Sequence, residues 1–346
     1  MTNNAMRTTV LFVVLLAVFL SACSTQPPGA KPPARRIRIG FSMDTLQEER
    51  WQRDRDLFVA RARELGAEVL IQSAAGDDDL QLSQAENMLR RGIDILVIVP
   101  HDARAMAPAV AQAHAAGVKV IAYDRLVRDA DVDLYISFDN ERVGQAQAEY
   151  LTRKVPKGNY VYIGGAETDN NASLLRAGVT EVLEPYIDRG DIRLVYSQFT
   201  HDWRPEEARK HMEQALAQTG GKVDAVICGN DATAGAAVQA LYGYGLAGRV
   251  PVAGQDADLS AVQRIVRGTQ VMTVYKPIRL LATRAAEIAV AMAMGQGYEA
   301  NGAINNGLRD VPAYLLPPVT VDMNNLRETV IKDGFHQEQD VFAPLK

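Results

Sequence analysis

The chain has 346 residues, of which 47% are hydrophobic and 23% are charged, and its formal net charge is −5 at pH 7. The charges are scattered and form no basic stripe, which argues against nucleic acid as a partner. About 310 residues follow an apolar leader, a length that is large for one hydrophobic core and therefore predicts two lobes.

The first 36 residues are predicted to lie outside the fold. Arg7 precedes an apolar run, Val10–Leu20, that is too short to span a bilayer, so residues 1–22 are predicted to be a cleaved secretory signal. The run ends in Leu20-Ser21-Ala22-Cys23, which resembles a bacterial lipoprotein signal; an ordinary signal with a chance cysteine is the alternative. We therefore expect a lipid on Cys23, a proline-rich tether over residues 23–36, and a location in the periplasm or on the outer face of the cell membrane.

Neither a metal site nor a disulfide is predicted. Cys228, the only other cysteine, ends an apolar run and is expected to be a small buried residue. The five histidines are scattered, and none forms a ligand pair on one helix face. No cofactor is expected.

Apolar runs alternate with helical patterns along the first half of the body. Strands are predicted at Ile37–Met43, Glu68–Ser73, Ile93–Val99, Lys119–Tyr123 and Leu134–Phe138, and helices near Leu46–Leu65, Leu80–Arg91, Ala103–Ala116 and Arg142–Arg153. Gly66, Gly92 and Gly117 each lie between a helix and a strand, as left-handed C-caps do. The alternation predicts βαβ units and a parallel sheet.

The second half repeats this scheme. Its strands are predicted at Tyr160–Ile163, Arg193–Gln198, Ala225–Cys228, Val250–Gly254 and Val271–Tyr275, and its helices near Ala172–Leu183, Pro205–Gln218, Thr233–Tyr242, Leu259–Arg267 and Ile278–Met294. The tail from Asn301 contains one more apolar stretch, Pro318–Val321, which is expected to be a crossing segment or an added edge strand. Two similar halves predict an α/β protein with two doubly wound parallel-sheet lobes and a cleft between them.

Polar side chains follow the predicted strands at their carboxyl ends. The endings are Tyr123-Asp124-Arg125, Thr168-Asp169-Asn170-Asn171, Cys228-Gly229-Asn230-Asp231, Gly254-Gln255-Asp256 and Val274-Tyr275-Lys276. Open parallel sheets bind ligands beyond these ends, so the side chains are predicted to share one site. Carboxylates accept hydrogen bonds from hydroxyl groups, and Arg, Lys and Asn donate them, a combination that suits a neutral sugar. The alternatives are solvated surface charges and, for Asn230, a helix N-cap.

Two tryptophans are candidates for the flat faces of such a site. Trp51 opens the first helix, Trp203 follows the strand Arg193–Gln198, and both have polar neighbours in the sequence. An aromatic face covers the C–H patches of a sugar ring and keeps water from the adjacent hydrogen bonds. Core packing is the alternative.

The body resembles a known family, the periplasmic sugar-binding proteins of ABC importers, of the pentose/hexose type. The motifs that carry the resemblance span Ile37 to about Phe335 and are Glu49-Arg50-Trp51-Gln52, Ala122-Tyr123-Asp124-Arg125, Tyr135-Ile136-Ser137-Phe138-Asp139-Asn140, Asp169-Asn170-Asn171-Ala172, Asn230-Asp231-Ala232-Thr233-Ala234-Gly235, Gly254-Gln255-Asp256-Ala257-Asp258-Leu259 and Met272-Thr273-Val274-Tyr275-Lys276-Pro277. They are most similar to those of D-xylose-binding members. The resemblance implies a monomer without enzymatic activity, whose hinge closes on the sugar and which delivers the sugar to the membrane subunits of an importer.

The resemblance also implies particular sugar contacts and domain bounds. The contacts are Arg50, Asp124, Arg125, Asp169, Asn171, Asn230, Asp256 and Lys276, with Trp51 and Trp203 as aromatic faces. The first lobe is expected to comprise residues 37–139 and 277–309, and the second residues 140–276 and 310–346. The best-known members are freely soluble in the periplasm, so the expected lipid on Cys23 is a departure from them.

The sequence is also compatible with functions other than the import of D-xylose. A different pentose or hexose, or a role as the sugar-sensing partner of a chemoreceptor or histidine kinase, is compatible with every motif. The effector domain of a transcription regulator shares the fold but needs a DNA-binding element where this chain has a secretory signal. An enzyme ranks last, because the chain has no phosphate loop and no nucleophile elbow, and only Asp124 and Asp256 as a conceivable glycosidase pair.

Overall fold

The computed structural model describes residues 35–343, and residues 36–343 belong to one compact unit. The predicted signal peptide, Cys23 and residues 23–34 of the tether lie outside the described residues. Among the helices that are described, none has the length and apolar character needed to cross a membrane.

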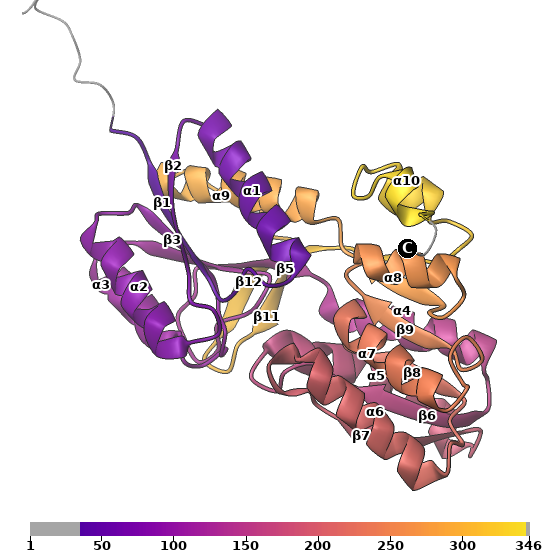
Figure 1. The fold of residues 1–346 in the computed structure, drawn as a ribbon. Helices are drawn as coiled ribbons and strands as arrows, with labels where there is room; N and C mark the ends of the chain where they lie inside the picture. The colour runs from indigo at the N-terminus through magenta and orange to yellow at the C-terminus, as the bar shows by residue number, and fades with distance from the viewer. Residues whose placement is uncertain (1–34, 344–346) are drawn as a thin grey trace, which may run out of the picture. The chain divides into compact units, whose positions relative to one another are not determined.

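The first lobe is built on a seven-stranded sheet in the order β11-β12-β5-β4-β3-β1-β2 (Figure 1). The strands are β1 (Arg38–Met43), β2 (Glu68–Ser73), β3 (Ile95–Val99), β4 (Lys119–Tyr123), β5 (Leu134–Phe138), β11 (Gly302–Asn305) and β12 (Asp310–Leu316). All neighbours pair in parallel except β11 and β12, which form an antiparallel hairpin at the edge.

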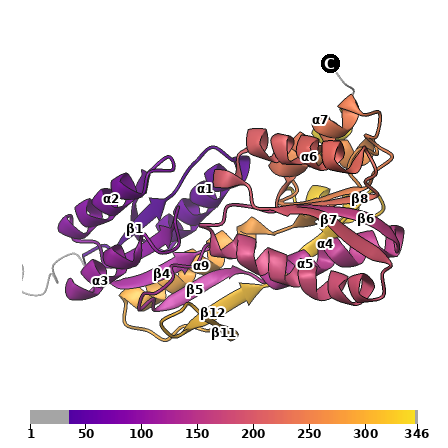
Figure 2. The same cartoon turned by 90° about the horizontal axis from the view of Figure 1, so that it is seen from below.

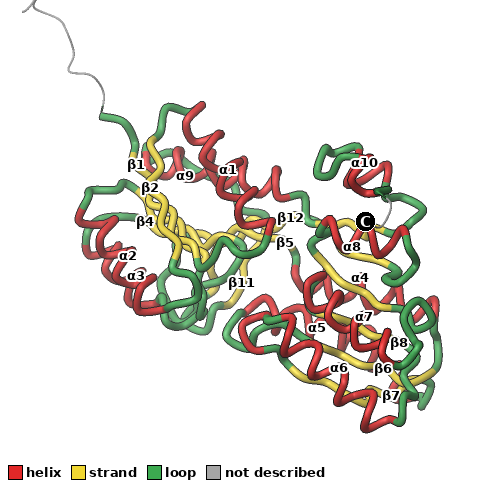
Figure 3. The backbone as a smooth tube through the Cα atoms, in the orientation of Figure 1, coloured by secondary structure: helices red, strands yellow, loops and turns green. Residues whose placement is uncertain are grey.

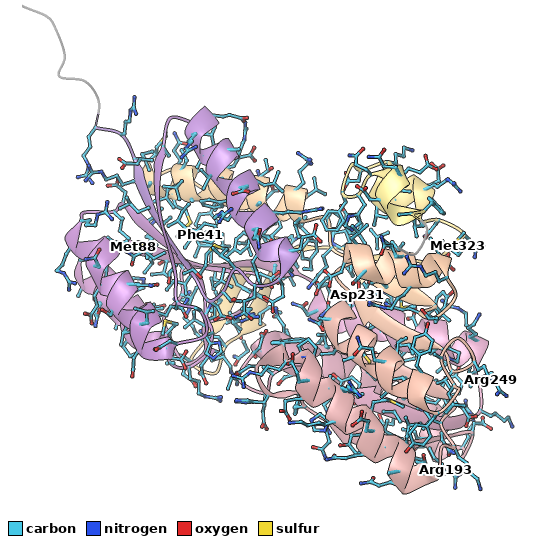
Figure 4. All side chains as sticks on the ribbon, viewed as in Figure 1. Phe41, Met88, Arg193, Asp231, Arg249 and Met323 are labelled. Atoms are coloured by element: carbon cyan, nitrogen blue, oxygen red, sulfur yellow. The ribbon has the colours of Figure 1, made fainter. Side chains whose placement is uncertain are left out.

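Helices cover both faces of this sheet. The helices α1 (Glu49–Glu64) and α9 (Ile278–Ala293) lie side by side on one face, and α2 (Asp78–Arg90) and α3 (Ala107–Ala115) cover the other (Figure 2). Phe41 and Met88, labelled in Figure 4, belong to the two separate hydrophobic clusters that result. Every residue of β3 is buried, since successive side chains of a strand point to opposite faces and both faces are covered.

The second lobe has a six-stranded sheet in the order β13-β10-β9-β8-β6-β7. Its strands are β6 (Gly158–Ile163), β7 (Ile192–Gln198), β8 (Ala225–Cys228), β9 (Val252–Gln255), β10 (Met272–Tyr275) and β13 (Val319–Val321). Its helical segments are α4 (Asn140–Lys154), α5 (Asn170–Asp188), η1 (His201–Trp203), α6 (Pro205–Thr219), α7 (Asp231–Gly243), α8 (Leu259–Val266), η2 (Arg327–Ile331) and α10 (Glu338–Val341). Residues of α4 and α5 join one cluster with the sheet, and residues of α6 and α7 join another. This arrangement confirms the predicted fold class of two doubly wound α/β lobes.

Two glycines allow α4 and α5 to pack closely. A Cβ added at Gly144 would lie closer than 3.0 Å to the backbone of Leu175, and one added at Gly178 would be equally close to the backbone of Glu141. The helices therefore touch through their backbones at this crossing, where no larger residue fits.

The chain crosses between the lobes three times, as the tube in Figure 3 allows the reader to follow. The crossings lie between β5 and α4, between β10 and α9, and between β12 and β13. The prediction that places the last crossing near Asp310 is wrong. Residues Asp310–Leu316 form β12, which pairs in parallel with β5 and buries Val311 and Ala313, so the first lobe extends to Leu316.

Other local predictions agree with the structure. Gly66, Gly92 and Gly117 have φ of 81°, 72° and 73°, which confirms their left-handed conformation after a helix. Pro205 is the first residue of α6. Pro318–Val321 contributes β13, an edge strand antiparallel to β10. Cys228 is fully buried, and burial raises the pKa of its thiol.

Candidate functional site

One pocket lies between the two lobes, at the carboxyl ends of the parallel strands, and the space free of protein atoms in it, open solvent included, is about 380 Å³. It is lined by Glu48, Arg50, Trp51, Asp124, Arg125, Asp169, Asn171, Trp203, Asn230, Gln255, Asp256 and Lys276. These include all ten residues that the sequence predicts for the site, and the structure separates none of them from the others.

Arg50 is the centre of the charge network in the pocket. It lies in the first turn of α1, is 6% exposed, and its Nη2 is 2.7 Å from Asp124 Oδ2. Its Nε is 3.3 Å from Asp54 Oδ2, one turn along the same helix. Burial alone lowers the pKa of Arg50, but Asp124, Asp54 and Asp256 outweigh this effect and raise it well above its usual range. The guanidinium is therefore a permanently charged donor.

Asp124 follows β4 in a left-handed conformation, with φ of 61°. Its amide donates to Ile136 O, and its carbonyl accepts from the hydroxyls of Tyr135 and Ser137 and from Asn171 Nδ2. Burial raises the pKa of Asp124, but the charges of Arg50 and Lys276 hold it below its ordinary value. The carboxylate is thus ionised and fixed in place as an acceptor.

Arg125 and Asp169 face each other across the lobes. Arg125 Nε is 2.9 Å from Asp169 Oδ2, and Arg125 Nη1 is 2.7 Å from Asp44 Oδ2. Burial raises the pKa of Asp169, and Arg125 only partly offsets this. Asp169 also accepts from Trp203 Nε1 at 3.2 Å, which orients the indole ring.

Asp256 and Lys276 supply a second pair from the second lobe. Lys276 Nζ is 2.8 Å from Asp256 Oδ1, and the same oxygen is 3.5 Å from Arg50 Nη1 in the first lobe. Asp256 follows β9 with φ of 93°, and Lys276 follows β10 and is 4% exposed. Asp124, Trp203 and Asp256 all have left-handed backbones although none is glycine. Such strained conformations cluster at ligand sites, where the surrounding hydrogen bonds enforce them.

The two asparagines occupy helix starts. Asn171 Nδ2 reaches the carbonyl of Asp124 at 3.0 Å and so joins the lobes. Asn230 is the N-cap of α7, where its Oδ1 accepts from Thr233 N at 2.9 Å. The alternative N-cap role of Asn230 is therefore real, but it uses only the oxygen, and the Nδ2 group remains as a donor for a ligand.

The tryptophans contribute differently. Trp51 is 4% exposed and packs into the cluster shared by α1 and α9, with the Arg50 guanidinium 4.2 Å from the centre of its ring. It thus lines the pocket while also belonging to the core, the role given above as the alternative. Trp203 is partly exposed and rests against Gly165 and Gly229, where a Cβ would crowd its ring.

Two lining residues, Glu48 and Gln255, are absent from the predicted site. Both are sequence neighbours of predicted residues, and Gln255 belongs to the strand ending Gly254-Gln255-Asp256, which is the signal that could have identified it. The prediction also lacks residues that hold the lining side chains in place. Asp54 follows Arg50 by four positions, a spacing that places both on one face of α1.

The pocket therefore contains three cations and three aspartates that pair with one another, together with Glu48, three amide side chains and two aromatic faces. The amides belong to Asn171, Asn230 and Gln255. Charged groups that hold each other in place make strong, directed hydrogen bonds without demanding a charge on the ligand. Among residues 35–343 no cluster of His, Cys, Asp and Glu is arranged to hold a metal ion. The arrangement suits a small neutral molecule with many hydroxyl groups.

Comparison with known proteins gives a consistent result. The model of the family "Periplasmic binding protein domain" matches residues 39–297. The chain is 53% identical to the D-xylose-binding periplasmic protein of Escherichia coli, in a match that covers 89% of this chain and 93% of that protein. It is 51% identical to the D-xylose-binding periplasmic protein of Haemophilus influenzae, with the same coverage.

A solved structure agrees with these sequence matches. A carbohydrate transporter solute-binding protein from Chloroflexus aurantiacus, in complex with D-glucose, has a TM-score of 0.82 and 35% identity. The comparison covers 88% of this chain and 98% of that one. This chain belongs to the periplasmic binding protein family.

Proposed function

We propose that this protein captures D-xylose in the pocket between its lobes and delivers it to the membrane subunits of an ABC sugar importer. The observation that carries the proposal is the single pocket in which all ten predicted contacts converge from both lobes. The two relatives of more than 50% identity, each named for D-xylose, support the choice of sugar. The protein acts as a binding protein and not as an enzyme.

Binding from both lobes explains how the sugar stabilises a closed state. The first lobe supplies Arg50 and Asp124, and the second supplies Asp169 and Asp256. A ligand shifts a conformational equilibrium only through a difference in affinity between the two states. Since a sugar that touches both lobes loses its contacts to one of them on opening, it favours closure, and the closed form is the one we expect the importer to recognise.

The same pocket explains selectivity for xylose. Glucose carries an additional exocyclic CH₂OH group, which a pocket closed from both lobes and walled by Trp51 and Trp203 would exclude by overlap. Ribose differs in the orientation of one hydroxyl, which would remove the hydrogen bond between that hydroxyl and its buried partner in the pocket. An unpaired buried polar group costs about 1–3 kcal/mol, or roughly one to two decades in affinity.

Calorimetric titration with a panel of pentoses and hexoses tests the proposal. We expect D-xylose to bind more tightly than D-glucose and D-ribose by about a decade or more. Equal affinity for all three sugars would favour a receptor of wider range, and the absence of sugar binding would refute the proposal. Small-angle scattering tests closure, because the radius of gyration should decrease on saturation with xylose.

We also propose that the protein acts on the outer face of the cell membrane as a monomer. Residues 1–22 would direct secretion, Cys23 would carry the lipid, and residues 23–36 would tether the body. Acyl chains contribute about 0.8 kcal/mol per buried CH₂, so two or more chains anchor a protein firmly. Cys23→Ala should abolish labelling by radioactive palmitate; wild-type protein that partitions into the aqueous phase of a detergent extraction would contradict the anchor.

A further inference from the structure

Gln255 is a pocket residue with one unused hydrogen-bonding atom. It is the last residue of β9, is 3% exposed, and lines the pocket beside Asp256. Its Nε2 donates to Gly229 O at 2.7 Å. Among the described residues, no group donates to its Oε1, although this atom is shielded from solvent.

The orientation of the amide is fixed by its own hydrogen bond. A carbonyl oxygen can only accept, so the atom that faces Gly229 O must be Nε2. The remaining atom, Oε1, is therefore an acceptor, and a buried acceptor without a donor is costly. The cationic donors of the pocket are engaged elsewhere, because Arg50, Arg125 and Lys276 all pair with aspartates at distances between 2.7 and 3.5 Å.

We propose that Gln255 is a further sugar-contacting residue, whose Oε1 accepts a hydrogen bond from one hydroxyl of the bound sugar. The inference deepens the function proposed above and rests on it. A neutral polyol supplies O–H donors without charge, which matches an uncharged acceptor placed next to Asp256. Loss of the matching hydroxyl leaves Oε1 unpaired again, so Gln255 discriminates between sugars at that position.

Gln147 provides a matched control. It lies in α4, is 1% exposed, donates through Nε2 to Cys228 O at 2.9 Å, and also has an Oε1 without a partner among the described residues. It donates to the residue adjacent to Gly229, yet it is not among the residues that line the pocket. Replacement of either glutamine removes the same kind of internal bond, and only Gln255→Leu also removes an acceptor from the pocket.

A thermodynamic cycle tests the inference. The affinities of the wild type, Gln255→Leu and Gln147→Leu are measured by calorimetry for D-xylose, for its 2-, 3- and 4-deoxy derivatives, and for 1,5-anhydroxylitol, which lacks the hydroxyl at C1. In the wild type we expect removal of the contacted hydroxyl to weaken binding by about 10-fold or more. In Gln255→Leu, the loss of affinity caused by removing the contacted hydroxyl should be at least fivefold smaller than in the wild type. For every other derivative, the loss of affinity should stay within twofold of the wild-type value. Gln147→Leu should show the wild-type losses for all derivatives.

The outcomes separate this inference from the function on which it rests. If the losses of affinity in Gln255→Leu change equally for all derivatives, or for none of them, Gln255 does not contact the sugar directly. Its role would then be structural only. Failure of the wild type to bind D-xylose would instead refute the proposed function, and this assignment with it. Thermal unfolding checks that each variant folds, and Gln255→Met, which keeps the unbranched shape, replaces Gln255→Leu in the cycle if the latter does not fold.

Discussion

Gly165→Ala should abolish tight sugar binding although Gly165 itself has no side chain in the pocket. A Cβ at this position would lie closer than 3.0 Å to several ring atoms of Trp203, a distance that Cβ atoms essentially never adopt. The backbone after β6 is held by the bond from Thr200 N to Gly165 O at 2.9 Å, so the indole ring must move instead. The variant therefore removes the aromatic wall without removing the tryptophan.

The size of the effect follows from the contacts that Trp203 makes. Displacement breaks the bond from its Nε1 to Asp169, and a hydrogen bond to a charged group contributes about 1.5–3 kcal/mol. The hydrogen bond alone corresponds to about 10- to 150-fold in affinity, and loss of the flat face adds to this, so we expect D-xylose to bind at least about 30-fold more weakly. Trp203→Ala should have an effect of similar size.

Calorimetry measures the affinity, and tryptophan fluorescence reports the movement of the ring, because Trp51 and Trp203 are the only tryptophans. Gly243→Ala is the control: this residue ends α7, and a Cβ there meets nothing within 4 Å. An affinity for Gly165→Ala within threefold of the wild type, with unchanged emission, would refute the role of the indole as a wall.

Three further predictions concern charge, pH and packing. Asp256→Ala leaves two buried cations without one of their carboxylates and should weaken xylose binding by about a decade or more in calorimetry, with the fold intact by circular dichroism; a neutral effect would contradict its place in the site. A hydrogen bond to Asp44 raises the pKa of His101 above 6.5, and His101 Nε2 lies 3.9 Å from Asp202 in the other lobe. Asp44 lies in the same lobe as His101 and raises its pKa whether the lobes are open or closed, whereas Asp202 raises it further only in the closed state. Protonation of His101 therefore favours closure, so affinity should fall about two- to fivefold as pH rises through the raised pKa, from pH 6 to pH 9, and His101→Gln should remove this dependence. Gly144→Ala forces α4 away from the backbone of α5 and should lower the free energy of unfolding by about 1–3 kcal/mol in a urea titration; an unchanged midpoint would show that the helices can separate without cost.

The strands and the pocket could be predicted from the sequence because each depends on a local pattern. Buried parallel strands such as β3 are uninterrupted apolar runs, and residues at their carboxyl ends must converge in an open α/β sheet. Asp124, Asp256 and Lys276 were found in this way, and Arg50 through the similarity of its motif to those of a known family. Neighbouring strand ends meet by topology, so no long-range information was needed.

The parts that escaped prediction depend on pairing partners far along the chain. The strand β12 contains Pro312, a residue that argues against a strand, and it becomes a strand because β5 and β11 pair with it on either side. Gln255 was not predicted for a different reason. Its neighbour Asp256 carries the stronger chemical signal, and only the structure shows that the Oε1 atom of Gln255 lacks a hydrogen-bond partner among the described residues. The dual role of Trp51 in core and pocket likewise requires the packing of α1 against α9.

A crystal structure of the protein with D-xylose tests the central claim most directly. The account predicts one sugar in the pocket between the lobes, with its ring against Trp203 and its hydroxyls bonded to Asp124 from the first lobe and Asp256 from the second. A sugar held by one lobe alone, or bound outside this pocket, would contradict it.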